Sequence, residues 1–158
     1  MGRTKRVLLI SSVGGHLEQL LGLKVVIDEF ESYMVTEKNN STINLKNKLP
    51  NLYFIPYLSR KNLLSFIVNF IKGAYISFKH YWKIKPSVIV TTGSGAVLPM
   101  CLIGKLFGSK IIFIETFSRI ESKTKTGKLA YYFADLFIVQ WKELLSIYPK
   151  AVYIGHIY

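Results

Sequence analysis

Two short glycine-rich segments are the part of the sequence whose residue types most clearly predict chemistry. The first reads VGGH over residues 13–16, and the second reads TTGSGAV over residues 91–97. Glycines between a strand and a helix let backbone N–H groups come close to a ligand, and the start of a helix favours an anion. The first segment is neither a P-loop nor a dinucleotide fingerprint, because it lacks the Gly-Lys-Ser/Thr run and the third glycine.

A tight turn without a ligand would explain either segment by itself, and Ser94 would then only cap a helix. Two such loops on neighbouring strand ends are more typical of a phosphate-binding cleft. The candidate residues for this cleft are Gly14, Gly15, Gly93, Ser94 and Gly95.

His16 and Glu115 are the candidates for acid–base chemistry. A histidine can take a proton from a hydroxyl group if its pKa lies near the working pH, and the positive end of a helix would keep it neutral. The alternative is a histidine that only caps or packs. Glu115 is the first acidic residue after Glu37. Its carboxylate could bind hydroxyl groups, orient His16 or form a structural ion pair, and the sequence leaves these roles open.

The other histidines and the single cysteine do not indicate a metal or cofactor site. His80 and His156 have no partners at the spacing of metal ligands. The single cysteine, Cys101, lies in an apolar run and is predicted to be a core residue of a protein from a reducing compartment.

The distribution of charge predicts an anionic partner. The chain carries a formal net charge of +12, and no acidic residue occurs between Glu37 and Glu115, where there are eleven Lys or Arg. Nucleic acid, anionic lipid head groups and a diphosphate-linked substrate all fit such a surface. A Lys-rich genome is the alternative; it would explain the many lysines but explains the missing acidic residues less well. Nucleic acid is not expected, because the aromatic residues follow helical spacing among aliphatic ones and no nucleic-acid motif occurs.

A long amphipathic helix is predicted at about residues 62–85. A narrow polar stripe of Ser65, Asn69, Lys72, Lys79 and Lys83 runs along a wide apolar arc. Aromatic anchors and lysines at the edge of an apolar face are typical of a helix that lies in a membrane interface. Packing of the apolar face on a sheet is the alternative, and the arc is wide enough for both. The predicted membrane-binding residues are Leu63, Phe66, Ile67, Phe70, Ile71, Lys72, Phe78 and Trp82.

These segments must be positioned by strands that alternate with helices. Short apolar runs predict strands at 7–12, 33–36, 52–56, 88–92, 110–115, 136–139 and 151–154. Helical patterns occupy 16–30, 63–82, 96–107 and 126–134, and 39–48 is polar and helical in pattern. Alternation of this kind predicts an α/β fold with a Rossmann-like parallel sheet and helices on both faces. No linker divides the chain, so we expect a single domain over residues 1–158.

The two glycine units resemble the loops of the N-terminal domain of GT-B glycosyltransferases. The most similar is the peptidoglycan enzyme that adds N-acetylglucosamine to the lipid-linked muramyl precursor. Residues 110–155 resemble a narrower family, the membrane subunit of the eukaryotic dolichol-linked chitobiose synthase (asparagine-linked glycosylation protein fourteen) and its bacterial capsule and exopolysaccharide homologues. This resemblance is carried by the ET-S-R run, the TGKL-Y and AD residues, VQW-E and YP-A-Y-G.

The resemblance implies half of a glycosyltransferase that is split between two polypeptides. The chain would dock on the cytoplasmic face of a bacterial cell membrane and present an undecaprenyl-diphosphate-linked saccharide, while a donor-binding partner would supply the UDP-sugar. The glycine loops would then face the acceptor diphosphate, His16 would be the base, and Glu115 and Arg119 would line the cleft. The residues expected to meet the partner are Trp141, Tyr153, His156 and Tyr158.

The eukaryotic subunit begins with a membrane-spanning helix, whereas this sequence begins almost directly in its first strand. Membrane attachment would therefore rest on the helix at about 62–85, with help from Arg3, Lys5 and Arg6. Two other functions stay open: a non-catalytic module that recruits and activates a partner glycosyltransferase, and an unrelated Rossmann enzyme that binds UDP or a dinucleotide by itself.

Overall fold

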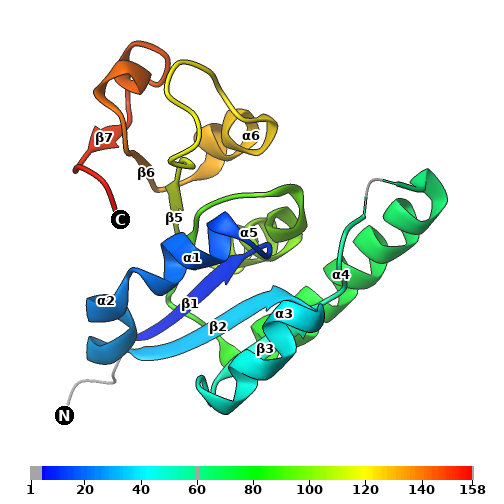
Figure 1. Ribbon diagram of the computed structural model, residues 1–158. Coiled ribbons are helices and arrows are strands. Elements are labelled where there is room, and N and C mark those ends of the chain that lie inside the picture. The colour runs from blue at the N-terminus through cyan, green and yellow to red at the C-terminus, as the bar shows by residue number, and fades with distance from the viewer. Residues whose placement is uncertain (1–4, 60, 158) are drawn as a thin grey trace.

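A twisted parallel sheet forms the centre of the computed structural model, which describes residues 5–59 and 61–157 (Figure 1). The described strands run in the order β3-β2-β1-β4-β5-β6-β7, and each pairs in parallel with its neighbours. Their bounds are β1 (Arg6–Ser11), β2 (Glu31–Glu37), β3 (Leu52–Ile55), β4 (Val88–Thr91), β5 (Lys110–Ile114), β6 (Leu136–Val139) and β7 (Val152–Tyr153). The predicted Rossmann-like fold is confirmed.

The strand order reverses at β1, so the loops that follow β1 and β4 lie next to each other at the carboxyl edge of the sheet. This switch point is where ligands bind in open parallel sheets. Both glycine segments are therefore in the position that the sequence pattern predicts.

Helices cover both faces of the sheet. On one face lie α1 (Gly15–Leu21), α2 (Lys24–Glu29), α3 (Asn40–Ile43) and η1 (Asn44–Asn47). The other face is covered by α4 (Leu63–Ile84), η2 (Gly95–Val97), α5 (Leu98–Leu106) and α6 (Lys125–Phe133). A short 3₁₀ helix, η3 (Lys142–Ser146), packs with α6 and the last strands in a third apolar cluster.

The helix predicted over residues 16–30 is wrong in one respect, because it is two helices. α1 ends at Leu21 with Gly22 as its C-cap, and α2 begins at Lys24. A Cβ atom at Gly22 would lie 3.1 Å from the backbone oxygen of Ile157, so glycine there lets the C-terminal segment pass close to α1. The pattern of apolar residues continues through the break and does not reveal it.

Helix α4 is only partly anchored to the domain. Asn62 caps its first turn by accepting a hydrogen bond from the backbone N–H of Ser65 (3.0 Å). The buried residues of α4 are Gly73, Ser77, Tyr81 and Ile84, which run from the middle of the helix to its C-terminal end. The first two turns contain no buried residue, and in Figure 1 this end of the helix extends beyond the sheet. Among the described residues, no helix is long and apolar enough to cross a bilayer.

Candidate functional site

The two glycine loops meet at the carboxyl ends of β1 and β4. Gly14 and Gly93 have φ angles of +77° and +104°, which favour glycine because it has no Cβ. The side-chain hydroxyl of Thr92 donates a hydrogen bond to the backbone oxygen of His16 (2.8 Å), so it ties one loop to the other. A Cβ atom at Gly93 would lie 3.7 Å from His16 Cε1. The imidazole therefore packs on the second glycine loop.

Ser94 is the one residue of these loops whose geometry argues for strain. Its φ of +87° lies in the left-handed region, although it is not glycine. The hydroxyl oxygen accepts a hydrogen bond from the backbone N–H of Ala96 (3.3 Å). The helix-capping role that the sequence left open is thus present, and strained backbone of this kind is frequent at binding sites.

The environment of His16 keeps its ring neutral. Burial lowers the pKa of His16 below its ordinary value, and the Thr92 backbone and the negative charge of Glu115 offset this only in part. Nδ1 is buried and has no hydrogen bond of good geometry to any described residue. A neutral imidazole is the form that a general base requires.

Glu115 lies one strand further along the same edge, but its carboxylate is fully engaged. It accepts hydrogen bonds from the backbone N–H of Thr116 (3.0 Å), the hydroxyl of Thr124 (2.9 Å) and the hydroxyl of Tyr148 (2.8 Å). The side chain is buried under the start of α6, where a Cβ atom at Gly127 would lie 2.0 Å from Glu115 Oε2. This geometry favours a structural role, although no ion pair holds the carboxylate within the described residues. The catalytic role stays a prediction.

Glu37 is a second buried carboxylate at this edge, and sequence reasoning did not single it out. Its oxygens accept hydrogen bonds from the backbone N–H groups of Leu58 (2.8 Å) and Val13 (3.3 Å). Burial raises the pKa of Glu37, and these two hydrogen bonds oppose the shift. Like Glu115, it is an acidic residue that ends a buried strand, and that signal could have marked it.

A cavity of about 260 Å³ opens beside Glu37. It lies between the two glycine loops and the segment that leads into α4. Its lining residues are Ser12, Val13, Glu37, Tyr57, Leu58, Phe66, Ser94, Gly95 and Ala96. The cavity therefore places the glycine loops next to the first turns of the amphipathic helix.

The remaining predicted site residues lie on the C-terminal side of the sheet. Arg119 is exposed and donates a hydrogen bond to the hydroxyl of Ser122 (3.2 Å). The rings of Trp141 and His156 have centroids 4.7 Å apart, and both contact Phe117. Tyr153 lies on β7 and is half-buried, whereas Tyr158, like Arg3 and Arg60, lies outside the described residues.

Comparison with known proteins identifies the family of the chain. The family described as "Oligosaccharide biosynthesis protein Alg14 like" matches residues 14–157. The chain belongs to the Alg14-like family. The human UDP-N-acetylglucosamine transferase subunit ALG14 is 25% identical over 96% of this chain and 82% of its own length. The Schizosaccharomyces pombe subunit of the same name is 27% identical over the same shares of the two chains.

Solved structures of other proteins share the fold of this Alg14-like chain. MurG from Acinetobacter baumannii superposes with a TM-score of 0.71 at 15% identity, over 88% of this chain and 42% of MurG. UDP-N-acetylglucosamine 2-epimerase from Rickettsia bellii gives a TM-score of 0.73 at 13% identity, over 98% of this chain and 46% of the epimerase. The chain thus spans less than half the length of each of these proteins.

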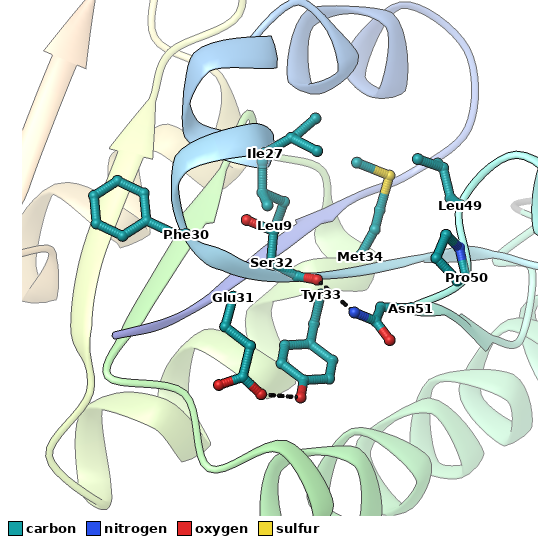
Figure 2. Close-up of a pocket in the computed structure, with 10 residues that line it drawn as sticks. All are labelled: Leu9, Ile27, Phe30, Glu31, Ser32, Tyr33, Met34, Leu49, Pro50 and Asn51. Carbon is teal, nitrogen blue, oxygen red and sulfur yellow. Dashed lines mark hydrogen bonds between the residues drawn. The ribbon is translucent and has the colours of Figure 1, made fainter. Parts of the chain in front are cut away.

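Another cavity of the Alg14-like chain, of about 250 Å³, lies at the opposite end of β2 (Figure 2). Figure 2 shows Ile27 of α2, Phe30 directly after this helix and Leu49 beside β2 among its lining residues, together with polar side chains such as Asn51. Its one carboxylate, Glu31, accepts hydrogen bonds from Tyr33 and Arg6. Because ligands bind at the carboxyl ends of parallel strands, this amino-end cavity is not the candidate site.

No group of three or more His, Cys, Asp or Glu that could hold a metal ion occurs in the described part of the chain. Cys101 is buried, and burial raises the pKa of its thiol to about 12. Such a thiol is protonated at neutral pH and fits the predicted core role.

Proposed function

We propose that this chain is the acceptor-binding, membrane-associated subunit of a two-component glycosyltransferase. A second subunit binds the UDP-sugar, and the pair transfers the sugar to a saccharide linked to a lipid diphosphate. Since relatives are named UDP-N-acetylglucosamine transferase subunits, UDP-N-acetylglucosamine is the first donor to test. The undecaprenyl-linked acceptor, the cytoplasmic face of a bacterial membrane and a role in capsular or exopolysaccharide synthesis are further parts of this proposal.

The observation that carries the proposal is that His16, in the first glycine loop, contacts the second glycine loop at the switch point of the sheet. The hydrogen bond from Thr92 to the His16 backbone and the packing of the ring on Gly93 build one site from two distant segments. A neutral histidine beside backbone loops suited to an anion fits an acceptor that carries both a hydroxyl group and a diphosphate.

In the proposed reaction, His16 takes the proton of the acceptor hydroxyl. The oxygen attacks the anomeric carbon of the UDP-sugar held by the partner, and the bond between that carbon and UDP breaks. UDP leaves with the electron pair of the broken bond, and the configuration at the carbon inverts. Each proton and electron pair is accounted for without a metal or redox step.

The exposed face of α4 supports the membrane part of the proposal. Leu63 is 73% exposed and Ile71 is 63% exposed. So many exposed large apolar side chains on one helix are unusual for a surface that faces only water. Among the other predicted membrane-binding residues, Ile67, Lys72, Phe78 and Trp82 are exposed, and Phe66 and Phe70 are half-buried. Lys79 and Lys85 lie over the rings of Tyr75 and Trp82. Lysines beside interfacial aromatic rings are typical of helices that lie on anionic membranes.

The test is sugar transfer by the chain, its donor-binding subunit, membranes and UDP-N-acetylglucosamine, with His16→Ala as the variant. We expect transfer to fall by a factor of about 10² to 10⁴, as for removal of a general base. The matched control is His80→Gln, because His80 is also half-buried but hydrogen-bonds to Phe54 O, away from the glycine loops. Unchanged turnover of a folded, paired His16→Ala protein would remove His16 from the mechanism.

A non-catalytic recruiter is the second candidate, and the carboxylate of Glu115 favours it. With three hydrogen bonds inside the domain, that carboxylate is not placed to orient His16. On this alternative the chain would activate the partner without chemistry of its own. The His16→Ala variant would then retain transfer, while loss of the α4 face would still abolish it on membranes.

A further inference from the structure

A basic cavity beside α6 lies apart from the two glycine loops and shares only Tyr148 with the residues described above. Its volume is about 450 Å³, which makes it larger than the cavity beside Glu37. Its polar lining consists of three lysines and three tyrosines: Lys123, Lys125, Lys128, Tyr131, Tyr132 and Tyr148. No acidic residue lines it.

The three lysines carry charge that the described part of the chain leaves uncompensated. The ion pairs found there join Arg6 to Glu31 and both Lys105 and Lys110 to Asp135. Lys123 instead lies over the ring of Tyr148, with Nζ 5.1 Å from the ring centroid. The buried carboxylate of Glu115 forms no ion pair with these lysines and already accepts three hydrogen bonds, one of them from the Tyr148 hydroxyl. The cavity therefore offers an anion positive charge and the hydroxyl groups of Tyr131 and Tyr132.

The cavity also adjoins exposed apolar side chains on the same face of the sheet as α4. Helix α6 packs against α5, and α5 packs against α4. Tyr132 of α6 is 87% exposed and Leu106 of α5 is 80% exposed, while Phe107 contacts Phe78 and Trp82 of α4. Exposed apolar residues thus continue from α4 through α5 to α6, and the lysines stand at the end of this layer.

We propose that this α6 cavity binds the phosphate of anionic phospholipid head groups and forms a second point of membrane contact. Two contacts, one apolar on α4 and one cationic on α6, fix how the domain is oriented on the bilayer. A single interfacial helix would leave the domain free to rotate about the helix axis. The proposal rests on the membrane association included in the proposed function.

The test measures binding of the full chain to vesicles of phosphatidylcholine alone and of phosphatidylcholine with phosphatidylglycerol. The variant is Lys123→Gln/Lys125→Gln/Lys128→Gln. Since each lysine near an anionic surface contributes about 1 kcal/mol, we expect binding to the anionic vesicles to weaken by about a hundredfold. Binding to the neutral vesicles should change by less than about threefold, because head groups there carry no net charge.

The matched control is Lys24→Gln/Lys46→Gln/Lys48→Gln, which removes the same charge from exposed positions on the opposite helix layer. We expect this control to retain most of the binding to anionic vesicles. Equal losses in the two triple variants would show a response to net charge alone and would overturn the site. Unchanged binding of the α6 variant would overturn it as well.

A third arm separates a lipid head group from soluble phosphate. Inorganic phosphate is titrated into the protein, and signals of Lys123 and Tyr148 are followed by NMR. Saturation at millimolar phosphate without competition against anionic vesicles would assign the cavity to a soluble ligand and would overturn the lipid assignment. Competition between phosphate and vesicles would support it.

A fourth variant, Leu64→Ser/Ile67→Ser/Ile71→Ser, distinguishes failure of this inference from failure of the proposed function. All three side chains are exposed on α4. If this variant binds both kinds of vesicle like the natural chain, membrane association through α4 is wrong, whatever the lysine variant does. If it loses binding to both kinds while the lysine variant loses neither, only the α6 site is wrong.

Discussion

At the scale of residues, three ionisable side chains at the carboxyl edge of the sheet have different environments. His16 is partly buried with an unsatisfied Nδ1, Glu115 is buried with three hydrogen bonds, and Glu37 is buried with two. A buried carboxylate without partners would destabilise the fold, so the hydrogen bonds explain why both acids are tolerated. Of these three ionisable side chains, His16 is the one with a buried polar atom that has no hydrogen-bond partner among the described residues.

The first prediction concerns the pH dependence of stability through His16. Burial lowers the pKa of the folded protein's His16 from an ordinary value of 6.5. Below 6.5 the unfolded chain therefore binds a proton that the folded chain does not, so the free energy of unfolding falls as the pH drops from 6.5 to the lowered pKa. The variant His16→Gln should remove this part of the dependence. Urea denaturation of both proteins between pH 5 and pH 7.5 measures it; parallel curves would contradict the prediction.

The second prediction concerns Gly127, where no side chain fits. A Cβ atom there would lie 2.0 Å from Glu115 Oε2 and 2.8 Å from the Tyr148 hydroxyl oxygen. Gly127→Ala should therefore lower the free energy of unfolding by about 1–3 kcal/mol, as overpacking of a core does. Chemical denaturation provides the measurement. Gly95→Ala is the control, since a Cβ atom at Gly95 meets nothing within 4 Å and its φ is not in the left-handed region; a similar loss in both would show that packing is not the cause.

At the scale of elements, α4 combines an anchored half with a projecting half. The buried residues recur at intervals of about one turn, from Gly73 to Ile84, and they face β3 and α5. Gly73 brings the helix close to Pro56, because its Cβ would lie 3.9 Å from the proline ring. The apolar side chains of the first half have no such partner on the sheet. One part of the helix thus packs on the domain, and the other part leaves its apolar side chains exposed for the proposed membrane contact.

The third prediction separates these two roles with a matched pair of isoleucines. Ile84 is 1% exposed, so Ile84→Ala should lower the free energy of unfolding by about 2–5 kcal/mol. Ile71 is exposed, so Ile71→Ala should change stability by less than about 0.5 kcal/mol. The exposed variant should nevertheless weaken vesicle binding. Denaturation and vesicle sedimentation on the same samples give both quantities, and equal stability losses would show that α4 is packed along its whole length.

At the scale of the whole molecule, a buried hydrogen-bond network joins the C-terminal segment to α1. The amide of Gln140 donates to Gln19 Oε1 (2.7 Å) and to the backbone oxygen of Glu115 (3.0 Å). Its own oxygen accepts a hydrogen bond from the backbone N–H of Ile157 (3.1 Å). The helix that begins at the VGGH loop is therefore connected to the segment where the donor-binding partner is expected.

The fourth prediction tests that expected interface. The side chain of Ile154 is exposed directly after β7, two residues before His156, whose ring contacts Trp141. Ile154→Glu should reduce the affinity for the donor-binding subunit at least about tenfold. A charge that is buried at an interface without a partner makes the free energy of binding less favourable by several kcal/mol. Co-purification and titration of the two subunits measure this. Val25→Glu, exposed on α2, is the control; equal pairing by both variants would place the interface elsewhere.

The sequence by itself determined the parallel strands, the positions of both glycine loops and the amphipathic α4. These features rest on local patterns, since runs of apolar residues, glycine junctions and helical spacing are read from neighbours in the chain. Tertiary structure alone decided that Glu37 bridges Val13 and Leu58, that Glu115 is held by Thr124 and Tyr148, and that three lysines of one loop and helix gather at a single cavity. Each of these depends on which segments the sheet order brings together, and side-chain contacts between distant segments leave no periodic trace in the sequence.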